Sequence, residues 1–412
     1  MGSLKGALAG LSLLLIACSE EPRPTPAESA DPPEAPSAVD PPPESEAPAP
    51  EPSAPDPAPA PVVPSEIGAA PPAPEAGCAF GTPSAIAAGQ WGDVARADDG
   101  FVAATSSSEG TRETLSVWRL EAGAEPTRLS THALTHPVPS DRRRAGPALS
   151  AEHVAWVDGE RSLFVAPLSP DARPTRIGGP ASLRFSPALV LDGDVRAVAW
   201  TDDSGTPMRV RGRLLRPSGE PTGEAADLTP EGGGGAAPSA LGASIVFLDP
   251  RAAMSVAHRA EVGTDGFAPT TVARPVGLVT APPVIAALGD ETSPWLAFSL
   301  VGAAATTAVG LVELGSAAPA RPIVPGTGYG TLHVDGDGRV VAADAPRDRP
   351  PDAPREIHVH VVGDDGALGE AAVITGPGGS GRRGRVAVGR DGVAVLFIEA
   401  GRAYVSFGRC QR

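Results

Sequence analysis

A two-part apolar motif recurs through most of this 412-residue chain. Each copy has a short apolar run, often preceded by proline, then a polar turn and a second apolar run. In one clear copy, Pro187-Ala-Leu-Val precedes Val198-Ala-Trp200. The second runs are Val102–Ala104, Val154–Trp156, Val198–Trp200, Ile245–Phe247, Leu296–Phe298, Val341–Ala343 and Val395–Phe397. Successive copies lie roughly 44 to 54 residues apart, which indicates one supersecondary unit repeated along the chain.

Each copy is typical of a small antiparallel sheet. Short alternating apolar runs separated by Gly and Pro favour strands, and no long helical period is present. The first six copies are each followed by another apolar run, a Gly- or Pro-containing turn and a further run, as at Val117–Leu120 before Gly123. We interpret this second element as the hairpin of the two outer strands. Four strands at this spacing are typical of a β-propeller blade.

The seventh copy lacks a fourth strand, because the chain stops soon after the run Arg402–Phe407. The segment Thr82–Ala88 has no copy before it and can supply that strand. We therefore predict an all-β domain over residues 78–412, a seven-bladed β-propeller closed by strands from both ends. Six or eight blades are the alternatives.

Cys78 and Cys410 flank this predicted domain. In an oxidising compartment such a pair indicates one disulfide that ties the two ends together. Two free thiols are the alternative. The cysteine and histidine spacing does not suggest a zinc site.

Residues 1–17 have the features of a signal peptide: Lys5, then an apolar stretch from Ala7 to Ala17 that is too short for a membrane-spanning helix. It ends in Leu15-Ile-Ala-Cys18, which resembles the lipobox of bacterial lipoproteins. The resemblance implies cleavage before Cys18, lipidation of Cys18 and a stable membrane anchor of two or more acyl chains. A signal peptide with a chance cysteine is the alternative. Ser19 is similar to an outer-membrane sorting signal and leaves periplasmic and surface orientations open.

After Cys18, the chain to residue 77 consists almost entirely of Pro, Ala, Glu, Ser and Asp, and we expect a disordered tether over residues 18–77. The tether holds 12 of the 49 acidic residues and one base, Arg23. Without these and Lys5, 37 acids remain against 31 arginines, a net charge of −6. Nucleic acid is therefore a poor partner for the folded part. Lys5 is the sole lysine, which excludes a lysine nucleophile in the processed chain.

The turns within the repeat include Leu191-Asp-Gly-Asp194 and Arg390-Asp-Gly392. With the preceding proline and the apolar-aromatic strand, this pattern resembles a degenerate form of the TolB-type and WD40-like propeller repeats. The resemblance covers most of residues 79–412 and implies the fold alone.

Few residues suggest chemistry. Trp156, Trp200, Phe247, Phe298 and Phe397 share one repeat position, so we interpret them as packing residues. His358 and His360 would leave one face of a strand and could hold a metal, although a solvated strand face explains them as well. Asp335-Gly-Asp337 resembles part of a calcium loop but lacks the later carboxylate, and Gly376–Gly381 lacks the Lys-Ser/Thr of a phosphate loop. We predict no catalytic residue, no metal and no cofactor.

Arginines gather where three of the predicted blades begin. They are Arg142, Arg143 and Arg144 before the second blade, Arg184 before the third, and Arg382, Arg383 and Arg385 at the start of the seventh. In a propeller these segments emerge on one face near the centre. Guanidinium groups pair bidentately with carboxylates and phosphates, so the pattern predicts a basic partner-binding face. Scattered solvated charges are the alternative.

These features together predict a monomeric, membrane-anchored envelope lipoprotein, most consistent with the outer membrane. Its propeller would be a binding module for a protein, cell-wall or anionic glycan partner. The alternatives are a propeller-type hydrolase or lyase that acts on an envelope polymer, with acidic residues around the centre, and a purely structural spacer.

Overall fold

The computed structural model describes residues 67–411 except 73, 75, 110–111, 137, 139–144, 251–254, 278–284, 289–294, 302–306, 314–320, 325–331, 336–339, 347–353, 364–366 and 391. For the strand residues between 272 and 339 and between 343 and 346, it describes the backbone alone. The chain divides into two units, Met1–Ala58 and Pro59–Arg412, and every described residue belongs to the second. Among these residues, no helix is long and apolar enough to cross a membrane.

The described part of the chain forms seven antiparallel sheets, numbered here in chain order. Sheet 1 contains β3 (Trp91–Ala97), β4 (Gly100–Glu109), β5 (Arg112–Leu120) and β6 (Thr127–Ala133). Sheet 2 contains β7 (Ala148–Leu149), β8 (His153–Val157), β9 (Leu163–Pro167) and β10 (Thr175–Gly178). Sheet 3 contains β11 (Ala188–Asp192), β12 (Val195–Asp202), β13 (Arg209–Leu215) and β14 (Pro221–Asp227).

The next three sheets follow the same plan. Sheet 4 contains β15 (Ala236–Leu241), β16 (Ser244–Asp249), β17 (Ser255–Gly263) and β19 (Thr271–Gly277), with the short β18 (Gly266–Phe267) also paired to β17. Sheet 5 contains β20 (Ile285–Leu288), β21 (Trp295–Val301), β22 (Thr307–Glu313) and β23 (Arg321–Val324). Sheet 6 contains β24 (Leu332–Asp335), β25 (Val340–Pro346), β26 (Arg355–Val361) and β27 (Ala372–Ile374).

Sheet 7 is built from both ends of the folded unit. It contains β28 (Arg382–Val388), β29 (Val393–Glu399) and β30 (Arg402–Gln411), together with β1 (Gly77–Phe80) and β2 (Ser84–Ala88). Strand β2 pairs with the first half of β30 and β1 with the second half. The expected strand from Thr82–Ala88 is therefore confirmed as β2, and β1 extends it beyond what the sequence indicated.

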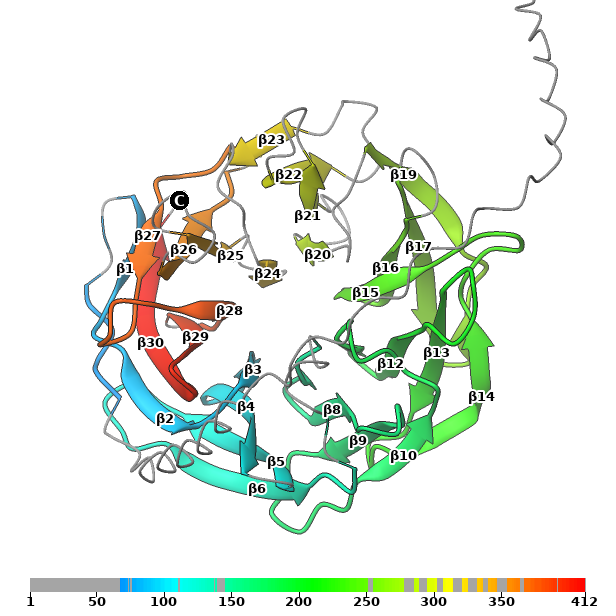
Figure 1. Ribbon diagram of the computed structural model, residues 1–412, viewed down its shortest axis with the longest axis horizontal. Coiled ribbons are helices and arrows are strands. Elements are labelled where there is room, and N and C mark those ends of the chain that lie inside the picture. The colour runs from blue at the N-terminus through cyan, green and yellow to red at the C-terminus, as the bar shows by residue number, and fades with distance from the viewer. Residues whose placement is uncertain are drawn as a thin grey trace, which may run out of the picture. The chain divides into compact units, whose positions relative to one another are not determined.

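The sheets follow one another around a common centre (Figure 1). The first strand of each sheet lies innermost, and these strands contact one another in sequence: β3, β7, β11, β15, β20, β24, β28 and β3 again. The arrangement is propeller-like, as the repeat predicted, and it places the start of every inner strand near the centre of this unit.

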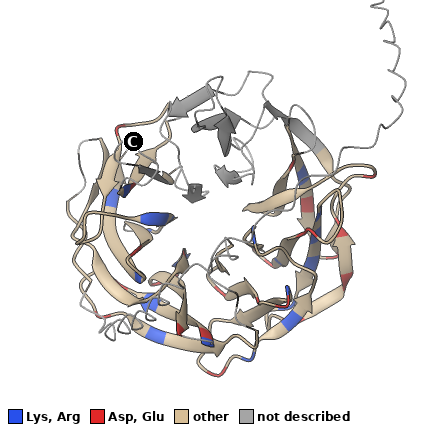
Figure 2. Ribbon diagram, viewed as in Figure 1, with Lys and Arg blue, Asp and Glu red and all other residues tan. Residues whose placement is uncertain are grey.

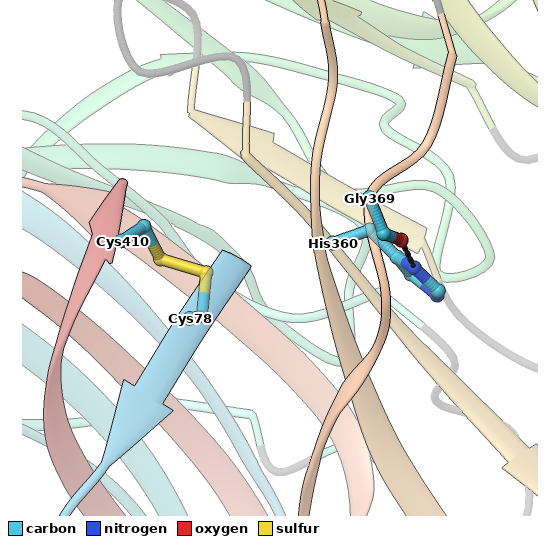
Figure 3. The surroundings of a disulfide bond; sticks show 4 residues. All are labelled: Cys78, His360, Gly369 and Cys410. Atoms are coloured by element: carbon cyan, nitrogen blue, oxygen red, sulfur yellow. Dashed lines mark hydrogen bonds between the residues drawn. A yellow bond between two sulfur atoms is a disulfide. The ribbon is translucent and has the colours of Figure 1, made fainter. Parts of the chain in front are cut away.

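A disulfide joins Cys78 to Cys410, as predicted, with an S–S distance of 1.99 Å (Figure 3). The two residues lie directly opposite each other in the β1–β30 ladder. Both side chains pack against the core cluster that sheets 6 and 7 share. The bond therefore fixes the outer edge of sheet 7.

The second strand of each clear repeat supplies the core. In β8, β16 and β29 every residue is buried, because neighbouring sheets cover both faces of these strands. Trp156, Trp200, Phe247 and Phe397 are buried, which confirms their packing role, whereas the side chain of Phe298 lies outside the described residues. The turn at Asp192-Gly193 also follows the sequence, with Gly193 at a φ of 53°.

The first described residues already contact sheet 1. The N–H of Ile67 donates to the carbonyl of Ala124 at 3.0 Å, and the N–H of Gly123 donates to the carbonyl of Ile67 at 2.9 Å. The Ile67 side chain is buried in the cluster shared by sheets 7 and 1. Ile67 lies within the segment 18–77 that we expected to be tether, so this part of the expected tether packs against the domain instead.

Candidate partner-binding face

The predicted arginines fall into three groups in the structure. Arg382, Arg383 and Arg385 lie on β28, the inner strand of sheet 7, where Figure 2 shows a basic segment directed toward the centre. Arg184 is exposed in the connection from β10 to β11. Arg142, Arg143 and Arg144 lie outside the described residues.

Arg383 joins sheet 7 to sheet 1. Its guanidinium carbon lies 3.3 Å from the ring centroid of Trp91, and its Nη1 donates to the carbonyl of Gln90. Stacking over an indole face is the most favourable cation–π arrangement. The ladder between β28 and β29 has a bulge between Arg382 and Arg385, and Arg383 has a φ of 59°. Such a bulge changes the direction of a side chain, and here it accompanies the turn of Arg383 toward the neighbouring sheet.

Arg385 pairs with a buried carboxylate. Its Nε lies 3.8 Å from Oδ1 of Asp93 on β3, and Oδ2 of Asp93 accepts the N–H of Leu149 on β7 at 2.8 Å. Asp93 thus links three sheets. Burial raises the pKa of Asp93 to about 6, against the opposing effects of Arg385 and the Leu149 N–H. A pKa near 6 would suit a general acid, but this carboxyl is buried and engaged between sheets, so we interpret it as a structural link.

The starts of the inner strands of sheets 2 and 3 also meet. The N–H of Gly146 donates to Oγ of Ser186 at 3.0 Å, and the N–H of Ala145 donates to the carbonyl of Leu183 at 2.9 Å. A Cβ placed on Gly146 would lie 3.9 Å from Nη2 of Arg385. The inner-strand starts of sheets 7, 1, 2 and 3 are therefore in contact in turn. We call the surface around Arg184, Arg382, Arg383 and Arg385 the arginine face.

A pocket of about 800 Å³ opens beside Arg382 and Arg383. Its walls come from the β27–β28 connection, the start of β28 and the β29–β30 turn. They include Pro377, Gly378, Ser380, Ile398, Glu399, Ala400, Gly401, Arg402 and Tyr404. Sequence reasoning missed Arg402, which reaches this place because the two-residue turn at Ala400-Gly401 sets it opposite Glu399.

The glycine-rich segment Gly376–Gly381 encloses a carboxylate. Oε2 of Glu399 accepts the N–H of Gly378 at 3.0 Å, and Oε1 accepts the N–H of Ser380 at 2.8 Å. A Cβ on Gly376 would lie only 2.1 Å from Oε2. The glycines therefore allow the backbone to approach Glu399 closely, which explains a segment that lacks the lysine of a phosphate loop.

The histidine pair has mixed surroundings. His360 is buried, and its Nδ1 lies 3.0 Å from the carbonyl of Gly369, to which it donates in the matching tautomer (Figure 3). Burial lowers the pKa of His360 and favours the neutral ring. A solvated face was the wrong interpretation for His360, because sheet packing covers it. Nε2 of His358 lies 3.5 Å from Oε2 of Glu356. Within the described residues, no group of three potential ligands is placed to hold a metal, and Asp337 lies outside them.

No family model matches the chain, and no curated protein matches it. Among solved structures, the β-propeller domain of Cps50 (Swd1) from Myceliophteria thermophila has 13% identity and a TM-score of 0.47, with 78% of this chain and 98% of that chain covered. A protein assigned as TolB from Agrobacterium tumefaciens has 14% identity and a TM-score of 0.40, with 65% and 89% covered.

A puromycin-hydrolyzing peptidase from Mycobacterium tuberculosis has 15% identity and a TM-score of 0.43, with 72% of this chain covered. This chain spans about half of the peptidase, since 51% of it is covered. The chain is thus distantly similar in structure to β-propeller domains, and the similarity concerns the fold alone.

Proposed function

We propose that this chain is an envelope lipoprotein whose domain is a binding module. In this proposal Cys18 carries the lipid anchor, the expected tether is disordered from residue 18 only as far as residue 66, because Ile67 packs against the domain, and the domain is a seven-bladed β-propeller closed by strands from both ends. The partner is a protein, a cell-wall component or an anionic glycan. The lipobox-like sequence before Cys18 and the proline-rich composition after it support the anchor and the tether.

The arginine face is the observation that carries the binding role. Arg382 is exposed at the start of β28, Arg184 is exposed before β11, and the backbone that follows the Arg142–Arg144 run contacts both neighbourhoods. Guanidinium groups lose little hydration on pairing and form bidentate contacts with carboxylates and phosphates. Near the centre, the carboxyl of Asp93 is already engaged by Arg385 and by the N–H of Leu149. Asp93 therefore gives no specific support to a hydrolase or lyase.

The anchor is tested with the full-length chain and its Cys18→Ser variant. We expect labelled palmitate to enter the parent protein and to be absent from the variant, which should leave the membrane fraction. Equal labelling of the two proteins, or no labelling of either, would refute the anchor.

Binding is tested by capture from envelope extract with the full-length chain. One variant changes to Ser five of the seven arginines that the sequence predicted for the basic partner-binding face, namely Arg142, Arg143, Arg144, Arg382 and Arg383. The matched control changes five exposed arginines on outer strands to Ser, namely Arg112, Arg119, Arg128, Arg176 and Arg409. Both variants lose the same charge. We expect a partner that the parent and the control capture and the first variant loses. Capture by all three, or loss from both variants, would contradict a specific arginine face.

A further inference from the structure

The pocket in sheet 7 combines exposed cations with an ordered polar wall. Arg382 is exposed and Arg402 partly exposed, and neither forms an ion pair with another described residue. Arg383, beside them, is held by Trp91 and Gln90 and so contributes a fixed positive charge. Toward the described residues, these two guanidinium groups of the pocket therefore have donors that a ligand can use.

Glu399 limits which anions fit. Its carboxylate is buried in the pocket wall, and each oxygen already accepts one backbone N–H. Each carboxylate oxygen can accept a second hydrogen bond, so hydroxyl donors of a ligand can pair with it. Glu399 would repel an anionic group placed against it, so the anionic group of a ligand must lie on the side of Arg382 and Arg402. The charge pattern thus favours a ligand that carries both an anionic group and hydroxyl groups, and the carboxylate is the anionic group that we propose.

The volume of the pocket and its other lining residues suit a sugar unit. Pro377, Ile398 and Ala400 supply an apolar surface for the C–H face of a ring, and Ser380 supplies a hydroxyl. A volume of about 800 Å³ lies in the range of small-molecule sites and exceeds the needs of an isolated carboxylate.

Backbone strain gathers at the same place. Four non-glycine residues in the described chain have positive φ angles, and two of them, Arg383 at 59° and Ala400 at 46°, line this pocket. Non-glycine residues in this region cost stability and persist where the surroundings hold them, often at ligand sites. Two of the four positive-φ residues thus lie in this pocket, one at the β28 bulge and one in the β29–β30 hairpin turn.

We propose that the pocket binds a carboxylate-bearing saccharide, such as a uronic acid unit. Arg382 and Arg402 hold the carboxylate, while Glu399 and Ser380 accept hydroxyl donors of the sugar. This inference rests on the proposed binding function and names the ligand class of one part of the arginine face.

The test is calorimetric titration of the full-length protein with cellobiouronic acid, with cellobiose as the neutral counterpart and with inorganic phosphate. We expect the acid to bind at least about tenfold more tightly than cellobiose, because charge-assisted hydrogen bonds form only with the acid. Arg382→Ser and Arg402→Ser should each weaken binding of the acid by at least about tenfold. Arg409→Ser, an exposed change at the far end of β30, should leave it unaltered.

Several outcomes would overturn the inference. They are absent binding of cellobiouronic acid, equal binding of acid and cellobiose, phosphate binding as tight as the acid, or unchanged affinity in Arg382→Ser. A thermal unfolding midpoint equal to that of the parent shows that each variant is folded. If envelope capture depends on the five arginines but cellobiouronic acid does not bind, the binding function stands and this ligand assignment fails. If the acid binds as expected but capture is unaffected, the larger arginine face fails instead.

Discussion

Sheets 3 and 7 are both antiparallel blades, but sheet 3 has four consecutive strands, whereas sheet 7 has five strands that come from both ends of the folded unit. Sheet 3 takes β11 to β14 in order between Ala188 and Asp227, so each strand pairs with its neighbour in sequence. Sheet 7 joins β28–β30 to β1 and β2, and its disulfide links cysteines separated by 332 residues. The same architecture is therefore formed once by local contacts and once by very distant ones.

The polar interactions of the two sheets differ accordingly. Sheet 3 carries a largely exposed ion pair, Arg209 with Asp227, and a pair between partly exposed Arg211 and buried Asp202. Sheet 7 has the disulfide, the pair of Arg385 with buried Asp93, and a 2.7 Å hydrogen bond from Oγ of Ser406 to the carbonyl of Gly81. Closing a long loop costs more conformational entropy than closing a short one. We therefore expect the covalent and buried links of sheet 7 to dominate stability and the pairs of sheet 3 to add little.

Removal of the disulfide should have the largest effect. In the chain-entropy description, opening so long a loop lowers the free energy of unfolding by up to about 5 kcal/mol. We expect the Cys78→Ser/Cys410→Ser variant to unfold at clearly lower urea concentration than the parent, as measured by tryptophan fluorescence. The parent protein treated with reductant should match the variant. Coincident unfolding curves for oxidised parent and variant would show that the paired strands alone hold the two ends.

The Asp93–Arg385 link should give stability a pH dependence of characteristic sign. The pKa of Asp93 is about 6 in the folded protein and lies near 3.8 when the group is solvated, so the folded state binds this proton more tightly. Between pH 4 and 6 the free energy of unfolding should therefore fall as pH rises, by up to about 3 kcal/mol from this residue. Asp93→Asn, which mimics the protonated form, should lack this contribution.

The measurement is the difference between parent and Asp93→Asn in urea unfolding at pH 4 and pH 7. Burial lowers the pKa values of His153 and His360, so their contribution to the free energy of unfolding is lost as pH falls. This pH dependence is opposite in sign to that of Asp93. Their contributions cancel in the difference, because both proteins contain them. A difference that is the same at both pH values would exclude Asp93 as the source.

Gly376→Ala should have an intermediate effect on sheet 7. The new Cβ would lie 2.1 Å from Oε2 of Glu399, so the loop must move and weaken the hydrogen bonds from Gly378 and Ser380. Overpacking of this kind costs about 1 to 3 kcal/mol. Gly205→Ala is the matched control, because Gly205 lies in the connection between β12 and β13 and the nearest atom to its new Cβ is 3.9 Å away. Equal unfolding midpoints for the two variants would contradict the close approach.

The sequence predicted the repeat-based features well, for a physical reason. A strand buried on both faces needs a continuous apolar run, and such runs mark the second strands at Val154–Trp156 and Val198–Trp200. The turn at Asp192-Gly193 was visible because few other residues adopt its backbone. The cysteine pairing followed from the positions of Cys78 and Cys410 at the two ends of the repeat array.

The remaining features depend on tertiary contacts without a sequence period. Strand β1 is only four residues long, and its partner β30 lies at the other end of the chain. Arg402 lines the pocket because the hairpin turn between β29 and β30 places it there. It does not lie at the start of an inner strand, as the predicted arginines of sheet 7 do. For the buried Asp93–Arg385 pair the sequence held one signal, because Asp93 precedes Val94 in a run that is otherwise apolar. Its partner Arg385 could not be inferred from the spacing of residues.

Removal of the surface ion pair in sheet 3 should have the smallest effect. The side chain of Arg209 is 51% exposed and that of Asp227 is 30% exposed, so water screens their attraction. We expect Arg209→Ser to lower the free energy of unfolding by less than about 1 kcal/mol, and the loss should shrink further in high salt. Urea unfolding at low and high ionic strength measures both. A salt-independent loss as large as that of Gly376→Ala would mean that local pairs hold sheet 3 as firmly as buried contacts hold sheet 7. The contrast between the two sheets would then lie only in the separation of their strands along the chain.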